Sequence, residues 1–293
     1  MAAAHLHTVV TGASSGIGRA TALRLAAAGH HVFAGVRNPD DAAALRAAAH
    51  DGELTPLRLD VTDAAQVEAA AVQAGDHVGA AGLDALVDNA GIGVVWPLEL
   101  VPLEEVRRQF EVNVFGQLAV TQALLPLLRR AHGRVVVIGS IGDRLAMPFA
   151  GVLCASKAAV ASLAEALRQE LAPWDVRVVL VEPASIHTEA VDKLERDARR
   201  VVADFPPGGR ELYQDAYQRM VATFAAGERE GSPPEVVADT VARALAARRP
   251  RARYLVGKDA RRLATLAAVA PAPLFDALRR RLLHQPAPGS RAV

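Results

Sequence analysis

The 293-residue sequence has one cysteine, few aromatic residues and almost no net charge. Because Cys154 is alone, an intrachain disulfide and a cysteine-rich metal site are both excluded, and the composition is typical of a reducing cytoplasm. A formal net charge of +1 provides no overall field that would attract a nucleic acid. The histidines are scattered along the chain, so we expect no bound metal.

The sequence also lacks a long apolar run. The best candidate for a membrane span, residues 263–275, is too short and is interrupted by Pro271 and Pro273. The first seven residues lack the charged and apolar regions of a signal peptide. We therefore expect a cytoplasmic protein without a membrane span.

What the chain does have is a regular alternation of strand-like and helical patterns. Strand-like runs occur at 8–11, 31–36, 54–59, 83–87, 134–138, 177–181 and 253–256. Helical patterns lie between them at about 17–28, 40–50, 63–80, 103–130, 156–171 and 234–248. The alternation predicts one α/β domain over 1–293, a Rossmann-type, doubly wound parallel sheet of about seven strands with helices on both faces.

Two segments depart from this alternation. Residues 188–232 are helical and charged and follow the sixth strand, on the side where such sheets bind ligands, so we interpret them as a substrate lid. Residues 259–293 form a C-terminal helical tail. Its basic end, Arg279-Arg280-Arg281, suits a solvated helix terminus better than a membrane or nucleic-acid patch.

A glycine-rich turn follows the first strand. Gly12 allows a sharp turn, Gly16 a close approach of phosphate, and Gly18 close packing of the following helix. Strand, turn and helix place backbone N–H groups against a diphosphate, with Ser14, Ser15 and Ile17 in the same turn. An ordinary strand–helix turn is the alternative, because a lone glycine triplet is weak evidence.

The end of the second strand indicates which nucleotide is bound. Arg37 stands there, and the first carboxylate is Asp40. Because an arginine pairs with a 2′-phosphate whereas a carboxylate repels it, NADP(H) is preferred over NAD(H).

Further motifs follow the later strands in order: Asp60-Val61, Asn89-Ala90-Gly91, Asn113, Ser140, Lys157, and a loop containing Pro183, Ala184, Ile186 and Thr188. Together with the glycine turn, this order resembles the short-chain dehydrogenase/reductase family from Thr8 to about Val256. The resemblance implies cofactor contacts by the turn and loop residues, with Asp60 and Val61 at the adenine and the last loop at the nicotinamide carboxamide. Asp88 and Ala184 depart from the pattern, which commonly has Asn and Gly there.

The resemblance also implies a catalytic set. Ser140 would hold a substrate carbonyl, Lys157 would bind the nicotinamide ribose, and Asn113 would organise a water that links the lysine to solvent. The family's proton donor is a tyrosine four residues before the lysine, but here that position is Leu153. Leucine carries no proton. Cys154 points to a different helix face, and Tyr213 or Tyr217 would have to reach the site from the lid.

Three interpretations remain open. The first is an NADP(H)-dependent oxidoreductase whose proton comes from water or Lys157, since losing one general acid costs about 10²–10⁴ in rate. The second is that Leu153, natural or engineered, is a lesion in an ordinary reductase. The third is a non-redox cyclase or isomerase, or an NADP-binding protein without catalysis.

Apolar residues of the lid, together with Trp96, Leu145, Met147 and Phe149, favour a hydrophobic ketone or alcohol, such as a steroid, retinoid or polyketide. The family resemblance further implies a homodimer or homotetramer formed through the helices at about 103–130 and 156–171.

Overall fold

The computed structural model describes residues 6–49 and 52–290. Seven strands form one sheet in the order β3-β2-β1-β4-β5-β6-β7, and each neighbouring pair is parallel. The strands are β1 (Leu6–Val10), β2 (His30–Val36), β3 (Leu54–Arg58), β4 (Ala85–Asp88), β5 (Arg134–Ile138), β6 (Arg177–Pro183) and β7 (Arg253–Val256). The predicted doubly wound parallel sheet is confirmed.

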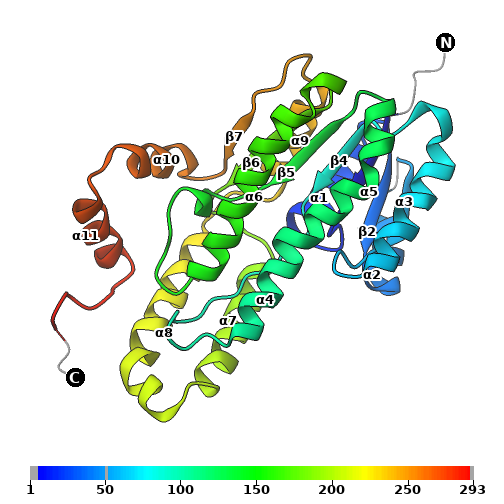
Figure 1. The fold of residues 1–293 in the computed structure, drawn as a ribbon. Helices are drawn as coiled ribbons and strands as arrows, with labels where there is room; N and C mark the ends of the chain where they lie inside the picture. The colour runs from blue at the N-terminus through cyan, green and yellow to red at the C-terminus, as the bar shows by residue number, and fades with distance from the viewer. Residues whose placement is uncertain (1–5, 50–51, 291–293) are drawn as a thin grey trace.

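Helices cover both faces of the sheet (Figure 1). The helices α1 (Gly16–Ala26), α2 (Pro39–Ala48) and α9 (Glu235–Ala246) bury apolar side chains against one face. The helices α3 (Ala64–Val78), α5 (Gln117–Arg130) and α6 (Gly151–Glu170) cover the other. Short 3₁₀ turns are η1 (Gly79–Ala81), η3 (Ile141–Asp143) and η4 (Ala172–Trp174). Because both faces are covered, the strands are nearly continuous apolar runs.

The long helix predicted at 103–130 is divided in the structure. It consists of α4 (Leu103–Phe110), a π-helical turn η2 (Glu111–Gly116) and α5. The π turn contains Asn113, and π turns occur frequently at functional sites. Helix α6 begins at Gly151 rather than near 156, so Leu153 and Lys157 lie one turn apart on the same helix.

The segment interpreted as a lid forms α7 (Ala190–Ala203) and α8 (Pro207–Arg229). Its apolar side chains pack with the segment that follows β4: Phe205 contacts Trp96 at 5.6 Å between ring centroids and Tyr217 at 5.7 Å. The tail forms α10 (Ala260–Val269) and α11 (Ala272–Leu282), which extend from the side of the body (Figure 1). Within 6–49 and 52–290, no helix combines the length and the apolar character that a membrane crossing requires.

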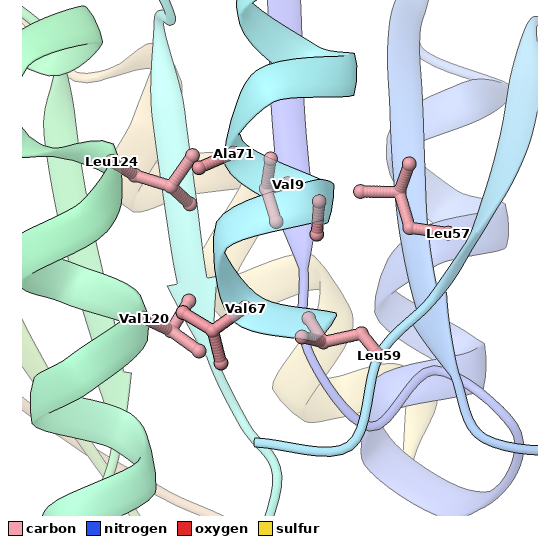
Figure 2. A pocket seen from close by; sticks show the side chains of 8 residues that line it. Val9, Leu57, Leu59, Val67, Ala71, Val120 and Leu124 are labelled. Carbon is pink, nitrogen blue, oxygen red and sulfur yellow. The ribbon is translucent and has the colours of Figure 1, made fainter. Parts of the chain in front are cut away.

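Figure 2 shows a small void in the core between the sheet and helices α3 and α5. Its volume is about 10 Å³, and Val9, Leu57, Val67 and Leu124 are among its lining residues, all of which are apolar. A space of this size holds at most about one water molecule. It is therefore a packing defect and not a substrate site.

Candidate active site

The predicted site residues meet at the carboxyl ends of the parallel strands. Arg37 follows β2, Asp60 follows β3, Asn89 follows β4 and Ser140 follows β5. The glycine turn after β1 lies between them because β1 pairs with both β2 and β4. This edge of a doubly wound sheet is where ligands bind.

The glycine turn has a backbone conformation and packing that only glycine allows. Gly12 and Gly16 have φ of +63° and +51°, conformations that glycine adopts without strain. A Cβ atom on Gly18 would lie 2.1 Å from the Gly12 carbonyl oxygen. The Asn89 side chain donates to the carbonyls of Thr11 and Gly12 at 3.0 and 3.1 Å and so fastens the turn to the end of β4.

The N-terminus of α1 contacts the carboxylate side chain of Glu189. The backbone N–H of Gly16 donates to the Glu189 carboxylate at 3.1 Å. A Cβ atom on Gly16 would also lie 3.3 Å from the Thr188 side chain, so the loop after β6 reaches this turn. A helix N-terminus that attracts a carboxylate fits the diphosphate of a dinucleotide equally well.

The segment after β4 is held from two sides. The Thr11 hydroxyl accepts hydrogen bonds from the backbone N–H groups of Asn89 and Ala90, both at 2.9 Å. Asp88, at the end of β4, is buried, and its carboxylate accepts from Thr121 at 2.5 Å. Burial raises the pKa of Asp88 to about 7.

Ser140 caps the 3₁₀ turn η3 with its side chain. Its Oγ accepts from the Gly142 N–H at 3.0 Å. Because Oγ is the acceptor in this bond, the hydroxyl hydrogen remains available to donate to a carbonyl oxygen. The turn therefore fixes the orientation of the serine side chain.

Lys157 lies on α6 and reaches the end of β5. Its Nζ donates to the Ile138 carbonyl at 2.8 Å. Burial lowers the pKa of Lys157 to about 8, and the charge of Asp143 opposes this shift. The ammonium group is therefore close to the point at which it releases a proton near neutral pH.

Leu153 lies one helical turn before Lys157, where i and i+4 side chains share a face. Its Cδ2 is 3.7 Å from the position that a Cβ atom on Gly93 would occupy, so it faces the segment after β4. Cys154 is buried, and burial raises the pKa of its thiol. Leu153 provides no acid, whereas the Cys154 thiol lies at the same turn as Ser140: a Cβ atom on Gly142 would be 3.4 Å from its Sγ and 3.3 Å from the serine Oγ.

A comparison with known proteins assigns the family. A family model described as short chain dehydrogenase matches residues 6–199. The chain belongs to the short-chain dehydrogenase family.

Several proteins are similar to this chain over most of its length. Retinol dehydrogenase 5 from Mus musculus is 36% identical over 290 residues, which cover 95% of this chain and 89% of the relative. An NADPH-dependent 3-dehydrocapnine reductase from Ornithobacterium rhinotracheale is 36% identical over 255 residues, covering 85% and 87%. A short chain dehydrogenase from Burkholderia cenocepacia, solved in complex with NADP, has a TM-score of 0.68 at 29% identity and covers 95% of this chain and 98% of its own.

The side chain of Asn113 is directed at the protein and not at an open site. Its Oδ1 accepts from Ile92 N–H at 2.8 Å, and its Nδ2 donates to the Ile92 carbonyl and to Ser156 Oγ, each at 3.1 Å. Gln109, which the sequence analysis missed, accepts from the Val94 N–H through Oε1 and donates from Nε2 to the Ile92 carbonyl and to Ser156 Oγ. Both amides therefore fix the segment after β4 against α6.

A buried acidic and basic cluster, also missed, lies behind Ser140. Glu182 accepts from Arg144 at 2.6 Å and from Arg253 at 3.1 Å, and Arg253 also contacts Asp143 at 3.1 Å. Burial and the neighbouring Glu182 raise the pKa of Asp143. The cluster joins η3, β6 and β7, so it fixes the turn that holds Ser140.

The loop that follows β6 takes its shape from main-chain contacts. Ala184 N–H donates to the Val256 carbonyl at 2.9 Å, and Ser185 has φ of +47°. Ile186 N–H donates to the Glu228 carboxylate of α8 at 3.2 Å. Burial raises the pKa of Glu228 to about 7. This loop, from Pro183 to Thr188, is therefore bonded to the lid helix α8.

The residues predicted to contact adenosine lie after β2 and β3, and the lid tyrosines pack against the segment after β4. Arg37 is exposed at the end of β2, Val61 is buried, and the Asp60 carboxylate accepts from Thr62 N–H at 3.0 Å. In the lid, the Tyr217 hydroxyl donates to the Val95 carbonyl at 2.9 Å and burial raises its pKa, while Tyr213 donates to Glu99.

Two of the predicted pocket walls lie elsewhere. Trp96 and Phe149 pack with the lid. Leu145 and Met147 instead pack with Ala260 of α10, because η3 turns them toward the C-terminal tail. The tail and not the lid covers this side of the Ser140 turn.

Proposed function

We propose that this chain is an NADP(H)-dependent oxidoreductase acting on a hydrophobic ketone or alcohol, with proton transfer that bypasses position 153. The observation that carries the proposal is the convergence of Ser140 and Lys157 on the end of β5, beside the glycine turn. The nicotinamide cofactor would supply or accept the hydride.

The residues have distinct roles in this proposal. The turn from Gly12 to Gly18 binds the diphosphate, Ser140 donates to the substrate oxygen, and Lys157 binds the nicotinamide ribose. With its pKa near 8, the Lys157 ammonium also supplies the proton, directly or through water. Leu153 contributes apolar surface alone. Reduction should then slow as the pH rises through about 8, because the proton donor is lost.

The preference for NADP(H) rests on Arg37, which is exposed at the end of β2. The names of the NADPH-dependent relative and of the NADP complex support it. Arg37→Ala should weaken NADPH binding about 10- to 100-fold, as expected for loss of a hydrogen bond to a charged group. NADH binding should be unchanged, and Arg46→Ala on the exposed side of α2 serves as the control. Equal losses for both cofactors would refute the assignment.

The substrate class rests on the apolar character of the lid, whose residues Phe205, Tyr217 and Met220 are buried in one cluster with the segment after β4. A retinol dehydrogenase among the relatives supports a steroid- or retinoid-like molecule.

We also propose a cytoplasmic homodimer or homotetramer. Leu103 and Phe115 are 62% and 54% exposed on the helices through which association was predicted. Size-exclusion chromatography with light scattering tests this association, and a monomer in solution would refute it.

The deciding experiment compares the chain with Leu153→Tyr and Leu153→Phe in NADPH consumption on a panel of hydrophobic ketones. If only the missing acid limits turnover, the tyrosine variant should be about 10²–10⁴ faster. The phenylalanine variant should match the parent, because it restores the ring without the hydroxyl.

Each result bears on the proposal. Turnover by the parent that falls above pH 8 supports Lys157 as donor, whereas turnover by the tyrosine variant alone makes Leu153 a lesion in a reductase. If all three bind NADPH and none oxidises it, the redox proposal fails on this panel. The second candidate function is then a non-redox enzyme or a binding protein. Leu153 favours this candidate, because a leucine cannot transfer a proton.

A further inference from the structure

Three histidines meet at the end of the sheet opposite the glycine turn. His7 lies on β1, His31 on β2 and His77 in the last turn of α3. Their ligand atoms all lie within 4.8 Å of one another. The ring centroids are 4.3 Å apart for His31 and His77 and 5.5 Å apart for His7 and His77. The sequence analysis expected no metal site, because positions 7, 31 and 77 are far apart in the chain.

The sheet register explains this cluster. His7 and His31 are direct partners on adjacent parallel strands, so their side chains lie on one face. Helix α3 covers that face and brings His77 over the same point. Phe33, two residues along β2, stacks on His31 at 4.7 Å between centroids and provides an apolar floor.

The ring of His31 is oriented by both of its nitrogens. Nδ1 lies 3.1 Å from the Glu53 carboxylate, and Nε2 lies 2.9 Å from the Thr55 hydroxyl. An ion that takes one nitrogen replaces one of these bonds and leaves the other to orient the ring. His7 has a carboxylate close by as well, with Nδ1 3.7 Å from Asp84. Acceptors behind imidazoles are the usual outer shell of a metal site.

We propose that His7, His31 and His77 bind one divalent transition-metal ion of the zinc class. Three imidazoles suit Zn²⁺, Cu²⁺ or Ni²⁺, and a fourth position remains for water. Tetrahedral Zn–N bonds of 2.0–2.1 Å place the nitrogens about 3.3 Å apart, so the rings must draw together by about 1.5 Å. His77 is exposed at a helix end and can make that adjustment.

The ion would have a structural effect. It would join β1, β2 and α3 at the amino-terminal ends of the strands, opposite the end that holds Ser140 and Lys157. It would therefore stabilise the fold and take no part in hydride transfer. An ion that binds only the folded state raises the thermal midpoint with its concentration.

The test uses the full chain without an affinity tag, stripped of metal by a chelator, and titrated with ZnCl₂ in a calorimeter and in thermal melts. We expect one ion per chain and a rising melting temperature. His77→Phe keeps the ring contacts but has no ligand atom, and it should weaken binding more than 100-fold. Glu53→Gln should weaken it about 10- to 100-fold. His284→Gln, on the exposed tail, should bind as the parent does.

Two results would overturn the proposal. One is equal Zn²⁺ affinity in the parent and in His77→Phe. The other is no binding by the parent at millimolar Zn²⁺, which would make the three rings an aromatic packing cluster with Phe33. The circular dichroism spectrum and the melting temperature of each metal-free variant serve as the check that the chain has folded.

Discussion

Replacement of Asp88 by asparagine should stabilise this protein at alkaline pH and leave it unchanged in acid. The Asp88 side chain is buried at the end of β4, where Thr121 donates to Oδ2. Oδ1 is buried without a hydrogen-bond partner among the described residues. Ionising this carboxyl therefore leaves a poorly compensated charge in the core.

The magnitude follows from linkage. Burial raises the pKa from 3.8 to about 7, so the folded state holds a proton on Asp88 that the unfolded chain releases. Stability should then fall as the pH rises from about 4 to about 7, and level off above, where both states are ionised. The total loss is up to about 4 kcal/mol. Asparagine has the same shape, accepts from Thr121 and does not titrate.

The assay is urea unfolding of the parent and Asp88→Asn, followed by circular dichroism at about pH 5 and about pH 8.5. The variant should gain about 1.5 kcal/mol relative to the parent at pH 5 and about 4 kcal/mol at pH 8.5, and nothing below about pH 4. A difference that is the same at both pH values would refute the reasoning, because it would show that Asp88 does not change its protonation state between them.

Two further substitutions test the diphosphate site. Gly18→Ala should cost about 3 kcal/mol or more and abolish NADPH binding, because its Cβ would meet the Gly12 carbonyl at 2.1 Å; Gly75→Ala, in α3 with ordinary contacts, should instead stabilise by about 0.5–1 kcal/mol. Glu189→Gln should tighten NADPH binding about two- to fivefold at low salt, because it removes the negative charge that now contacts Gly16 N–H. Unchanged affinity in both binding titrations would show that the turn does not hold the diphosphate.

The sequence predicted the strands within one or two residues because most of them are rich in β-branched and apolar residues and end at turn residues. It failed where remote contacts decide the backbone. The break at Glu111–Gly116 depends on Asn113 bonding to Ile92, 21 positions away. The start of α6 was placed late because Phe149, with φ of +65°, sits in a turn that propensity does not reveal.

In the candidate site too, some residues could be predicted from the sequence and others could not. Ser140 and Lys157 were predicted from the resemblance to the family, and the structure brings both to the end of β5. The acidic and basic cluster of Glu182, Arg144 and Arg253 was missed, since its members come from three separate segments. The same reason concealed His31 and its partners. Only register and helix packing bring such residues together, and neither can be read from spacing.

The contacts that orient the site do not pass through the side chain at position 153. Lys157 is held by the Ile138 carbonyl, Ser140 by Gly142, and the π turn by Ile92. Ser156 does bond to residue 153, but to its main-chain carbonyl, at 2.7 Å. A change of that side chain should therefore leave the serine and the lysine in place. For this reason a rate difference between the tyrosine and phenylalanine variants reports on proton transfer and not on folding.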